Sequence, residues 1–569
     1  MSQERSASAR RSLRWRYLVP VGVLAAAMTW WCARPLAPAA QERPGGSALV
    51  GTTNPRTTIE FSLVLRLPGQ RRLARFLDNV ENPASPAYHH FIDAATFGAR
   101  FGLPRTLLDR ATARLARDAV QVTGSYPQRT ALEVRAAAGT IDRLFGLRLI
   151  DYRSADGRHF HAPIGRAIVP RDLRDAIVAV AGLNNATVES DSAKANERDA
   201  AKAIEGMAPA NVKMAYDINP LTGRHITGQG EKIALIEFGA YQQSDLDGFD
   251  EQFGLPSVTP RNIAVDGGTP DASASAVAEA DLDLEIAHEI APAAQLLDYN
   301  APDTTASGAD AFGAVVDQIV ADGQASAASV SWGTCESATP AADIRRDEQA
   351  LEAAAARGIT VVAASGDAGA YTCQEDNASD HRLSVSWPSS SPFVLSVGGT
   401  SLSTTTAGVY QGETAWQDTL EQSGGGGGLS LDFPRPSWQV GPGVANQFSD
   451  GKRQLPDVAA DADPWSGWDT YTAGALTVAG GTSAAAPFWA ATIALIAQYA
   501  RQHGVTRLGF VDPMLYAIAA TPQRAEAFHD VTKGTNRYYP ATKGWDFATG
   551  LGSPDVYNLA QDVVTYARR

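Results

Sequence analysis

A serine in the segment 480–487, with the sequence GGTSAAAP, has the surroundings that a nucleophile needs. Gly480 and Gly481 allow a sharp backbone turn and a close approach of another molecule. An apolar helix is expected to begin at Ser483, and the unpaired N–H groups of its first turn would favour a developing negative charge. Pro487 is expected in that first turn, where its missing N–H costs little. The alternative is a serine that only caps a buried helix.

A serine nucleophile needs a base, and the usual base is histidine. Four of the nine histidines precede residue 184. The other five lie in no glycine-flanked or strand-end setting, and we interpret them as surface or structural residues: His225, His288, His381, His503 and His529. Any base must then be a carboxyl group.

Carboxyl groups are dense in the segment 278–290, AEADLDLEIAHEI, which has the spacing of a helix. Glu279 and Asp283 stand one turn apart, so burial would make them share a proton, and such a pair can accept a proton from serine. The same spacing relates two other pairs, Asp281 with Glu285 and Glu285 with Glu289. Spacing alone does not choose among the three pairs, and an acidic solvated face is the structural alternative.

A further carboxyl group, Asp367, lies in the segment 365–369, SGDAG, directly after the apolar segment 360–364. Ligands of open α/β sheets bind outside the carboxyl ends of the strands, where Asp367 is expected. A protonated Asp367 could donate a hydrogen bond to a developing oxyanion. An Asx-type turn is the alternative. The glycine run 424–428 is interpreted as a flexible loop that lies against a backbone, substrate being one candidate.

These residues must be positioned by a sheet. Five short apolar segments predict buried strands: 233–236, 295–299, 329–332, 360–364 and 394–397. Helix-length segments such as 310–322 and 341–357 separate several of them, a pattern typical of a parallel sheet covered on both faces. Residues 56–183 alternate short apolar runs with amphipathic stretches, which predicts a smaller α+β unit.

The N-terminus has the pattern of an export signal, because arginines precede an apolar stretch, 17–32, that small residues follow. An uncleaved membrane anchor is the alternative. The polar segment 184–207 predicts a linker open to cleavage. The net charge of −14 over 569 residues, with no basic run beyond the N-terminus, argues against a nucleic-acid partner. Cys335 and Cys373 are expected either to form one disulfide or to be buried thiols.

Together, three motifs resemble those of the sedolisins, serine-carboxyl peptidases with a subtilisin-like fold and a pro-segment of the kumamolisin-activating type. Residues 279–283, 365–369 and 480–483 match them in the family's order. The resemblance implies Ser483 as nucleophile, Glu279 as general base, Asp283 as its supporting acid and Asp367 as the oxyanion acid. It thereby selects one of the three acidic pairs.

The resemblance also implies supporting residues and a calcium site. Glu237 and Trp332 would extend the hydrogen-bond network, and a disulfide would join Cys335 to Cys373, as in some members. The C-terminal segments 528–534 and 544–550 are similar to the family's Ca²⁺ site, whose hard cation prefers oxygen ligands. The implied ligands are the carboxylates of Asp530 and Asp546 and the backbone carbonyls of Val531, Thr542 and Gly544. Thr542 replaces a glycine that is common in the family. Since the ligand at this position is a backbone carbonyl, it depends on the shape of the backbone and not on the side chain.

The resulting prediction is an α/β protein with a subtilisin-like parallel sheet, preceded by a smaller α+β prodomain. Its expected parts are a signal peptide or anchor (1–40), an inhibitory prodomain (41–183), a processing linker (184–207) and a peptidase domain (208–569). The expected function is that of a secreted, monomeric, acid-acting endopeptidase that matures itself, with protein or peptide substrates and its own prodomain as inhibitor. Two alternatives stay open. A subtilisin-type peptidase would need a catalytic histidine, and an inactive secreted binding protein would show no turnover.

Overall fold

The structure is a computed structural model that describes residues 47–154, 157–186, 189–190, 206–268, 271–302, 311–521 and 526–568. The predicted signal, 1–40, and most of the predicted linker lie outside these residues. Among the described residues, no helix has the length and apolar character to cross a membrane.

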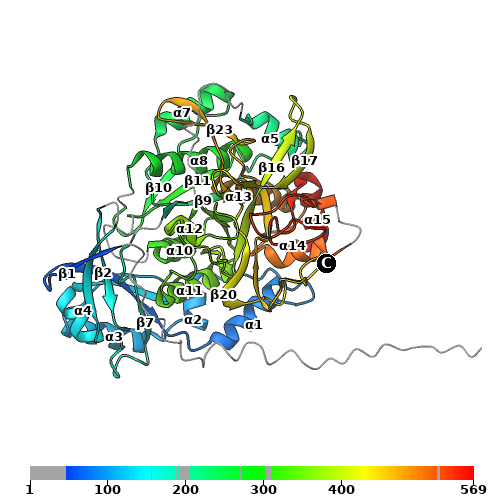
Figure 1. Cartoon of the computed structure of the whole chain (residues 1–569). Coiled ribbons are helices and arrows are strands. Elements are labelled where there is room, and N and C mark those ends of the chain that lie inside the picture. Colours follow the sequence, from blue (N-terminus) through cyan, green and yellow to red (C-terminus); the bar gives the residue numbers. More distant parts are fainter. Residues whose placement is uncertain are drawn as a thin grey trace, which may run out of the picture. The chain divides into compact units, whose positions relative to one another are not determined.

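The larger domain is built on one sheet of eight strands. They are β9 (Lys232–Glu237), β10 (Arg261–Ala264), β11 (Gln295–Asn300), β12 (Ala327–Val330), β14 (Thr360–Ala364), β16 (Val394–Thr404), β17 (Tyr410–Ala415) and β22 (Val458–Asp461). The strand order is β10-β11-β9-β12-β14-β16-β17, and β22 also pairs with β16. Figure 1 labels the strands β10, β11 and β9 toward one end of this order and β16 and β17 at the other. All neighbours are parallel except β16 and β17.

Helices cover both faces of this sheet. On one face α8 (Ala274–Ile290) packs against α13 (Thr482–Gln502), and on the other α10 (Ala311–Asp322) packs against α11 (Ala341–Arg357). Strand β9 shows why both faces are apolar. Ile233 and Leu235 belong to the core under α8 and α13, whereas Ala234 and Ile236 belong to the core under α10 and α11. Alternate side chains of a strand point to opposite faces, so a doubly covered strand is apolar throughout.

The smaller, N-terminal domain is α+β. Its strands are β1 (Ala48–Thr52), β2 (Thr58–Leu65), β3 (Gln121–Ser125), β4 (Ala131–Ala137), β5 (Arg148–Arg153), β6 (His159–Ile164) and β7 (Ile177–Ala181). They form an antiparallel sheet of order β3-β4-β2-β7 and a second of order β1-β5-β6. Its helices are α1 (Gln70–Glu81), α2 (Ala94–Arg100), α3 (Arg105–Arg117) and α4 (Ala138–Phe145). The predicted fold class, a parallel sheet flanked by helices after a smaller α+β domain, is confirmed.

The remaining elements connect or flank these layers. The helices are α5 (Pro209–Ala215), α6 (Asn219–Thr222), α7 (Gln243–Phe253), α12 (Cys373–Asp376), α14 (Asp512–Ala519) and α15 (Val556–Ala567). The strands are β8 (Glu189–Ser190), β13 (Trp332–Cys335), β15 (Ser386–Trp387), β18 (Gln417–Asp418), β19 (Ser423–Gly424), β20 (Gly428–Pro434), β21 (Lys452–Leu455), β23 (Trp468–Thr472), β24 (Ala475–Ala479), β25 (Phe528–His529) and β26 (Ser553–Pro554).

A buried ion cluster joins the two domains. Arg346 of α11 is fully buried, and its guanidinium contacts Glu133 of β4 and Asp317 of α10, each at 2.8 Å. Gln128 and Thr130, from the N-terminal domain, donate hydrogen bonds to the carboxylate of Asp317 at 2.6 and 3.0 Å. A cation between two carboxylates satisfies charges that would be costly to bury alone.

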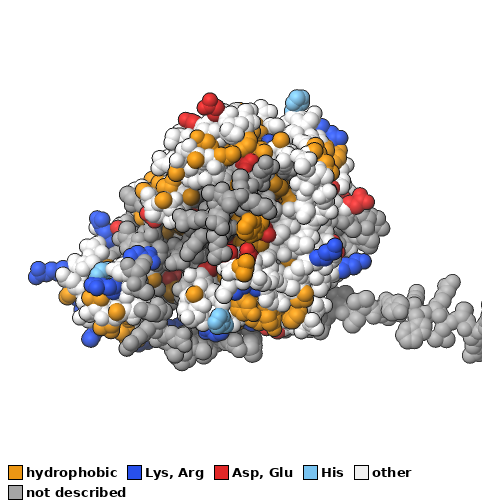
Figure 2. Space-filling view, turned by 45° about the horizontal axis from the view of Figure 1, so that its top comes forward, with side chains coloured by type: hydrophobic (Ala, Val, Ile, Leu, Met, Phe, Trp, Pro, Cys, Tyr) orange, Lys and Arg blue, Asp and Glu red, His pale blue; other side chains and the backbone are white. Residues whose placement is uncertain are grey.

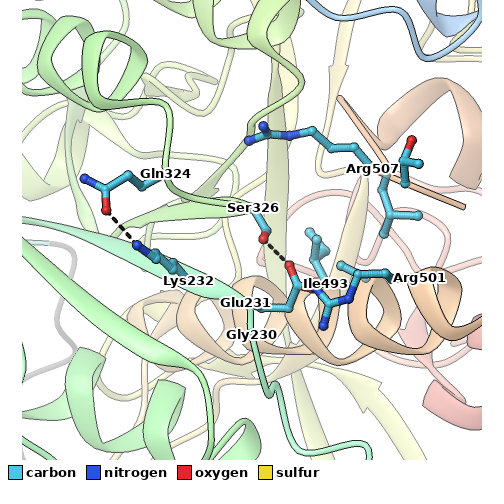
Figure 3. Close-up of a pocket in the computed structure, with 11 residues that line it drawn as sticks. Gly230, Glu231, Lys232, Gln324, Ser326, Ile493, Arg501 and Arg507 are labelled. Atoms are coloured by element: carbon cyan, nitrogen blue, oxygen red, sulfur yellow. Dashed lines mark hydrogen bonds and ion pairs between the residues drawn. The ribbon is translucent and has the colours of Figure 1, made fainter.

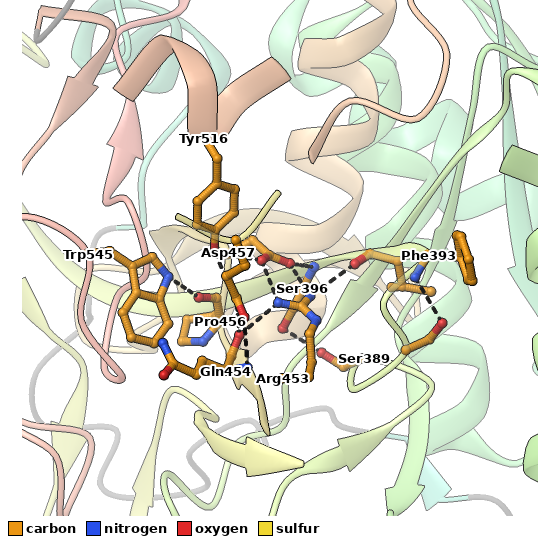
Figure 4. A network of polar contacts seen from close by, with 12 residues as sticks. Ser389, Phe393, Ser396, Arg453, Gln454, Pro456, Asp457, Tyr516 and Trp545 are labelled. Atoms are coloured by element: carbon orange, nitrogen blue, oxygen red, sulfur yellow. Dashed lines mark hydrogen bonds and ion pairs between the residues drawn. The ribbon is translucent and has the colours of Figure 1, made fainter. Parts of the chain in front are cut away.

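A second buried network anchors the end of the sheet near β22 (Figure 4). The guanidinium of Arg453 pairs with the carboxylate of Asp457, and both side chains are fully buried. Asp457 also accepts hydrogen bonds from the hydroxyl of Tyr516 and the backbone N–H of Ser396, each at 2.9 Å. This network fixes the strand β22 to β16 and to α14, and every member has a structural partner.

Two expectations about elements were wrong. Residues 329–332 do not form one strand, because β12 ends at Val330 and β13 begins at Trp332, in a different sheet. Pro487 does not lie in the first turn of its helix, because α13 begins at Thr482 and Pro487 lies inside it. Both differences lie beside Ser483 and have chemical consequences.

Candidate active site

Ser483 lies at the start of α13, directly after a strained glycine turn. Gly481 is the N-cap residue and has φ of 95°, a conformation that favours glycine. A Cβ on Gly480 would lie 2.7 Å from the backbone oxygen of Ala462, so that position also requires glycine. Ser483 is fully buried, and among the described residues its Oγ has no hydrogen-bond partner.

Ser331 links Ser483 to the acidic helix. In an α-helix the carbonyl of Ser483 would accept a hydrogen bond from the N–H of residue 487, but Pro487 has none. The carbonyl instead accepts a hydrogen bond from Ser331 Oγ at 3.3 Å, and the same hydroxyl lies 2.8 Å from Asp283 Oδ1. A hydroxyl has one proton, so it can donate to only one of the two acceptors at a time. Sequence reasoning missed Ser331, whose only signal was its place before Trp332.

Glu279 and Asp283 are both buried in α8, with exposed fractions of 1% and 0%. Burial raises the pKa of Asp283 well above its usual value, and the nearby charge of Glu279 raises it further. The charge of Glu279 also raises the pKa of Asp367. Glu279 is therefore within electrostatic reach of both of the other carboxyl groups.

Glu237 and Trp332 extend the same network. Glu237 is the last residue of β9 and is fully buried, and Trp332 Nε1 donates a hydrogen bond to its Oε2 at 3.2 Å. Burial and the charge of Asp283 raise the pKa of Glu237 well above its usual value. The carboxyl groups of Glu237 and Asp283 therefore disfavour being ionised at the same time.

Asp367 reaches the same site from the carboxyl end of β14. Its Oδ1 accepts hydrogen bonds from the backbone N–H of Thr482 at 2.7 Å and from the Thr482 hydroxyl at 2.9 Å. Its Oδ2 has no hydrogen-bond partner among the described residues. Burial raises the pKa of Asp367 well above its usual value, and the charge of Glu375 raises it further. Asp367 therefore favours the protonated form beside the residue that precedes Ser483.

The glycine run 424–428 lies against the turn that carries Asp367. Gly424 N–H donates to the carbonyl of Asp367, and Gly426 N–H donates to the carbonyl of Gly366, each at 2.7 Å. A Cβ on Gly426 would lie 1.8 Å from the backbone oxygen of Ser365, so this approach excludes every other residue. The run contacts a backbone, as expected, and the backbone is that of the Asp367 turn.

The other carboxyl groups of α8 do not form a solvated face. Asp281, Glu285 and Glu289 are each at most 1% exposed. Asp281 Oδ1 accepts the N–H of Gln242 at 2.7 Å, and Glu285 Oε2 accepts the N–H of Tyr471 at 2.8 Å. Asp281 and Glu285 thus hold neighbouring backbone segments, whereas Asp283 contacts the hydroxyl that reaches Ser483.

The histidines of the larger domain make contacts elsewhere. His288 is buried, with Nε2 near Pro256 O and Asp250 Oδ1 at 2.8 and 3.1 Å. The others contact different partners: His381 with Gln374, His503 with the carbonyl of Tyr499, His529 with the ring of Tyr410, and the His225 carbonyl with Gln498. Since Ser483 Oγ has no hydrogen-bond partner among the described residues, the described structure pairs no histidine with it.

Cys335 and Cys373 form a disulfide in the structure. It joins the end of β13 to the start of α12, six residues after Asp367 in sequence. The bond therefore ties together the strand that contains Trp332 and the helix that follows the Asp367 turn.

Hydrogen bonds connect several of the implied Ca²⁺ ligands in the C-terminal loops. The N–H of Gly544 donates to both carboxylate oxygens of Asp530 at 3.1 Å, and the N–H of Thr542 donates to Asp546 Oδ2 at 2.6 Å. Asp546 is 2% exposed, and burial raises its pKa to about 6. Among the described residues, no three His, Cys, Asp or Glu side chains are grouped to hold a metal. Two carboxylates with neighbouring carbonyls still fit a hard cation by donor chemistry.

A pocket of about 170 Å³ lies at the other end of the sheet and contains none of these residues (Figure 3). Lys232, which begins β9, and Ser326 line it, together with Glu231 and Arg501. Glu231 already pairs with Arg501 and accepts a hydrogen bond from the Ser326 hydroxyl at 2.5 Å. Because Glu237 ends the strand that Lys232 begins, the length of β9 separates the pocket from the carboxyl cluster, on the order of 20 Å.

Comparisons with known proteins agree with this arrangement. The chain matches the family model "Pro-kumamolisin, activation domain" over residues 45–186 and the model "Subtilase family" over residues 268–538. It is 32% identical to sedolisin of Pseudomonas sp. (strain 101) over 525 residues, covering 88% of this chain and 86% of that protein. It is 34% identical to kumamolisin of Bacillus sp. (strain MN-32) over 448 residues, covering 75% and 77%.

A solved structure is also similar. It is that of Pseudomonas sedolisin, a serine-carboxyl proteinase, complexed with two molecules of pseudo-iodotyrostatin. The TM-score is 0.58 at 32% identity, and the match covers 64% of this chain and 99% of that one. With the α/β fold, the N-terminal α+β domain and the cluster of carboxyl groups around a helix-start serine, these matches show that the chain belongs to the sedolisin family of serine-carboxyl peptidases and carries that family's activation domain.

Proposed function

We propose that this peptidase is an acid-acting endopeptidase that uses Ser483 as nucleophile and matures itself after export. One observation carries the proposal. Asp283 and the backbone of Ser483 share the hydroxyl of Ser331, while Asp367 is bonded to Thr482, so carboxyl groups flank the serine on both sides. Among the described residues, neither a histidine nor a carboxyl group is hydrogen-bonded to Ser483 Oγ itself.

In the proposed reaction, Ser483 Oγ attacks the peptide carbonyl and Glu279 accepts its proton, then passes it to the leaving amine. Asp283 orients and polarises Glu279. Asp367 donates its proton in a hydrogen bond to the oxyanion, for which its unpartnered Oδ2 is suited. Buried donors are effective here because the site is shielded from water.

An acid optimum follows from the two protonation states that this mechanism needs. Asp367 must stay protonated to donate, and its raised pKa extends that form to higher pH. Glu279 must be ionised to accept a proton, so the rate falls when the pH is low enough to protonate it. The active window lies between these limits.

The N-terminal domain acts in this proposal as an intramolecular inhibitor. In the predicted linker that follows this domain, the backbone of β8 pairs antiparallel with β13, Ser190 opposite Trp332, as an added peptide strand would. Residues 41–183 contain 20 Lys and Arg against 13 Asp and Glu, whereas residues 208–569 contain 19 against 43. The net charges, +7 and −24, attract each other, and acidification weakens this attraction by neutralising carboxylates. Figure 2 shows several Lys and Arg side chains at the end formed by the N-terminal domain.

A bound Ca²⁺ ion, held by Asp530, Asp546 and the carbonyls of Val531, Thr542 and Gly544, would supply structural stability, not chemistry. Export is proposed from the N-terminal signal pattern, with a membrane anchor only if that segment is not removed. A monomer with protein or peptide substrates, and no nucleic-acid partner, completes the proposal.

The decisive experiment compares Ser483→Ala with the unchanged precursor. Purified precursor is incubated at acid pH without other proteases, and its processing is followed by mass spectrometry. Ser483→Ala should remain full-length, while Ser379→Ala, on an exposed loop, should mature normally. Normal maturation of the Ser483→Ala precursor would refute the proposed nucleophile.

A further inference from the structure

Glu375 holds the backbone turn that presents Asp367. Its Oε1 accepts hydrogen bonds from the N–H of Asp367 at 2.7 Å and from the N–H of Ala368 at 2.8 Å. A carboxylate that accepts two backbone N–H groups makes strong, charge-assisted hydrogen bonds. The two N–H groups belong to the residue that carries the proposed oxyanion donor and to its neighbour.

The rest of this turn is satisfied by other groups. The N–H of Gly366 donates to the Thr482 hydroxyl, and the N–H of Gly369 donates to the carbonyl of Gly424. The carbonyls of Gly366 and Asp367 accept from the glycine run, and the carbonyl of Ala368 accepts from the guanidinium of Arg537 at 2.7 Å. Without Glu375, the N–H groups of residues 367 and 368 would lose the acceptor that the structure gives them.

Glu375 is itself fixed by a covalent anchor. It lies in α12, two residues after Cys373, whose disulfide to Cys335 ties α12 to the end of β13. The N–H of Cys373 also donates to the Ser384 hydroxyl at 3.0 Å. Because Glu375 is only two residues from the disulfide-bonded Cys373, in a helix of four residues, the disulfide restricts where the Glu375 backbone can lie.

Charge gives Glu375 a second effect. The groups around Asp367 are the carboxylates of Glu375 and Glu279 and the backbone N–H and hydroxyl of Thr482. The two carboxylates disfavour a negative charge on Asp367, and the two Thr482 donors favour it. Of the two carboxylates, Glu375 has the larger influence on Asp367.

We propose that Glu375 is a positioning residue of the peptidase reaction: its carboxylate fixes the turn that presents Asp367 and places a negative charge beside it. This inference rests on the proposed role of Asp367 as oxyanion donor. The geometry requires no contact between Glu375 and substrate. Its two effects, one on the backbone and one on charge, are separable by substitution.

The full-length precursor is first allowed to mature at acid pH. The test then measures kcat and KM of the matured enzyme as a function of pH, with a peptide that the enzyme cleaves. Glu375→Gln keeps an oxygen that can accept both N–H groups but removes the charge. Its kcat at the optimum should stay within about threefold, while the alkaline limb of the kcat profile moves to lower pH by about one unit. Glu375→Ala removes the acceptor as well, and its kcat should fall about 10- to 100-fold with little change in KM.

Gln374→Ala is the matched control on the same helix, because Gln374 contacts His381 and not the turn. It should reproduce the unchanged enzyme. An alkaline limb that stays in place in Glu375→Gln would overturn the charge effect, and an undiminished kcat in Glu375→Ala would overturn the positioning effect. Thermal unfolding of each variant shows whether it folds. If Glu375→Ala does not fold, the pH profile of Glu375→Gln alone tests the proposal.

Asp367→Ala, which removes the side-chain donor, separates this inference from the function on which it rests. If Asp367→Ala keeps full activity, the proposed oxyanion role is wrong. If Asp367→Ala is inactive while both Glu375 variants match the unchanged enzyme, only the inference about Glu375 is wrong.

Discussion

Pro487 stands four residues after Ser483 inside the same helix and cannot donate the hydrogen bond that the Ser483 carbonyl would normally accept. The Ser331 hydroxyl lies 3.3 Å from that carbonyl and 2.8 Å from Asp283. A proline inside a helix costs about 3 kcal/mol relative to alanine. Here its missing N–H leaves the backbone of the nucleophile open to a side chain that also contacts the acidic pair.

Ser331→Ala should lower kcat about 10- to 100-fold with KM little changed. The substitution removes the hydroxyl donor from a buried carboxyl group, a loss of about 1–3 kcal/mol. Steady-state kinetics of the matured enzyme checks this. Ser329→Ala is the matched control, since the Ser329 hydroxyl is buried nearby and has no hydrogen-bond partner among the described residues. Equal kcat values for the two variants would show that Ser331 does not support the acidic pair.

Asp281 should make the protein more stable at acid pH than at neutral pH. Burial raises its pKa to about 7 from a usual value of 3.8. The folded state then binds the proton more tightly than the unfolded state, so this contribution is complete below pH 3.8 and is lost as the pH rises through about 7. It amounts to about 4 kcal/mol at most. Thermal unfolding of the Ser483→Ala precursor between pH 4 and pH 8 measures it without self-digestion.

In that series, Asp281→Asn should flatten the dependence of Tm on pH, because the amide does not titrate. Asp247→Asn, at an exposed position of α7, should leave the slope unchanged. A slope equally steep in Asp281→Asn would assign the dependence to other groups.

Arg346→Met should loosen the docked N-terminal domain. It leaves the carboxylates of Glu133 and Asp317 buried without their cation, at a cost of about 3–5 kcal/mol. The precursor should then process faster at a given pH, as followed by gel electrophoresis over time. Arg382→Met is the control, because Arg382 is 68% exposed in its pair with Asp380 and surface pairs contribute little. If Arg346→Met is processed at the unchanged rate, the ion cluster around Arg346 does not hold the N-terminal domain in place against processing.

Removal of Ca²⁺ should lower Tm. A ligand that binds only the folded state at 100 times its Kd stabilises it by about 2.7 kcal/mol, and a chelator removes that contribution. Differential scanning calorimetry of the Ser483→Ala precursor, with and without chelator, checks this. In Asp546→Asn the Tm should no longer respond to chelator. A Tm of the parent that chelator does not change would contradict the calcium site.

The sequence alone predicted the elements whose patterns are local. The apolar segments 233–236, 295–299 and 360–364 are strands, and 341–357 is a helix, because a doubly covered strand and a buried helix each require a characteristic run of side chains. The motifs around Ser483, Glu279 and Asp367 also indicated the family, which the comparisons confirm.

Tertiary structure decided which side chains meet. Spacing left three acidic pairs equivalent on one helix. The family resemblance implied the pair of Glu279 and Asp283, and the contact of Asp283 with Ser331, on a neighbouring segment, gives a physical reason for that choice. Glu375 and the glycine run 424–428 give no local sign of holding the Asp367 turn, because hydrogen bonds to a backbone depend on where that backbone lies and not on its sequence. Local pattern specifies the elements, whereas the chemistry depends on contacts between residues far apart in the chain.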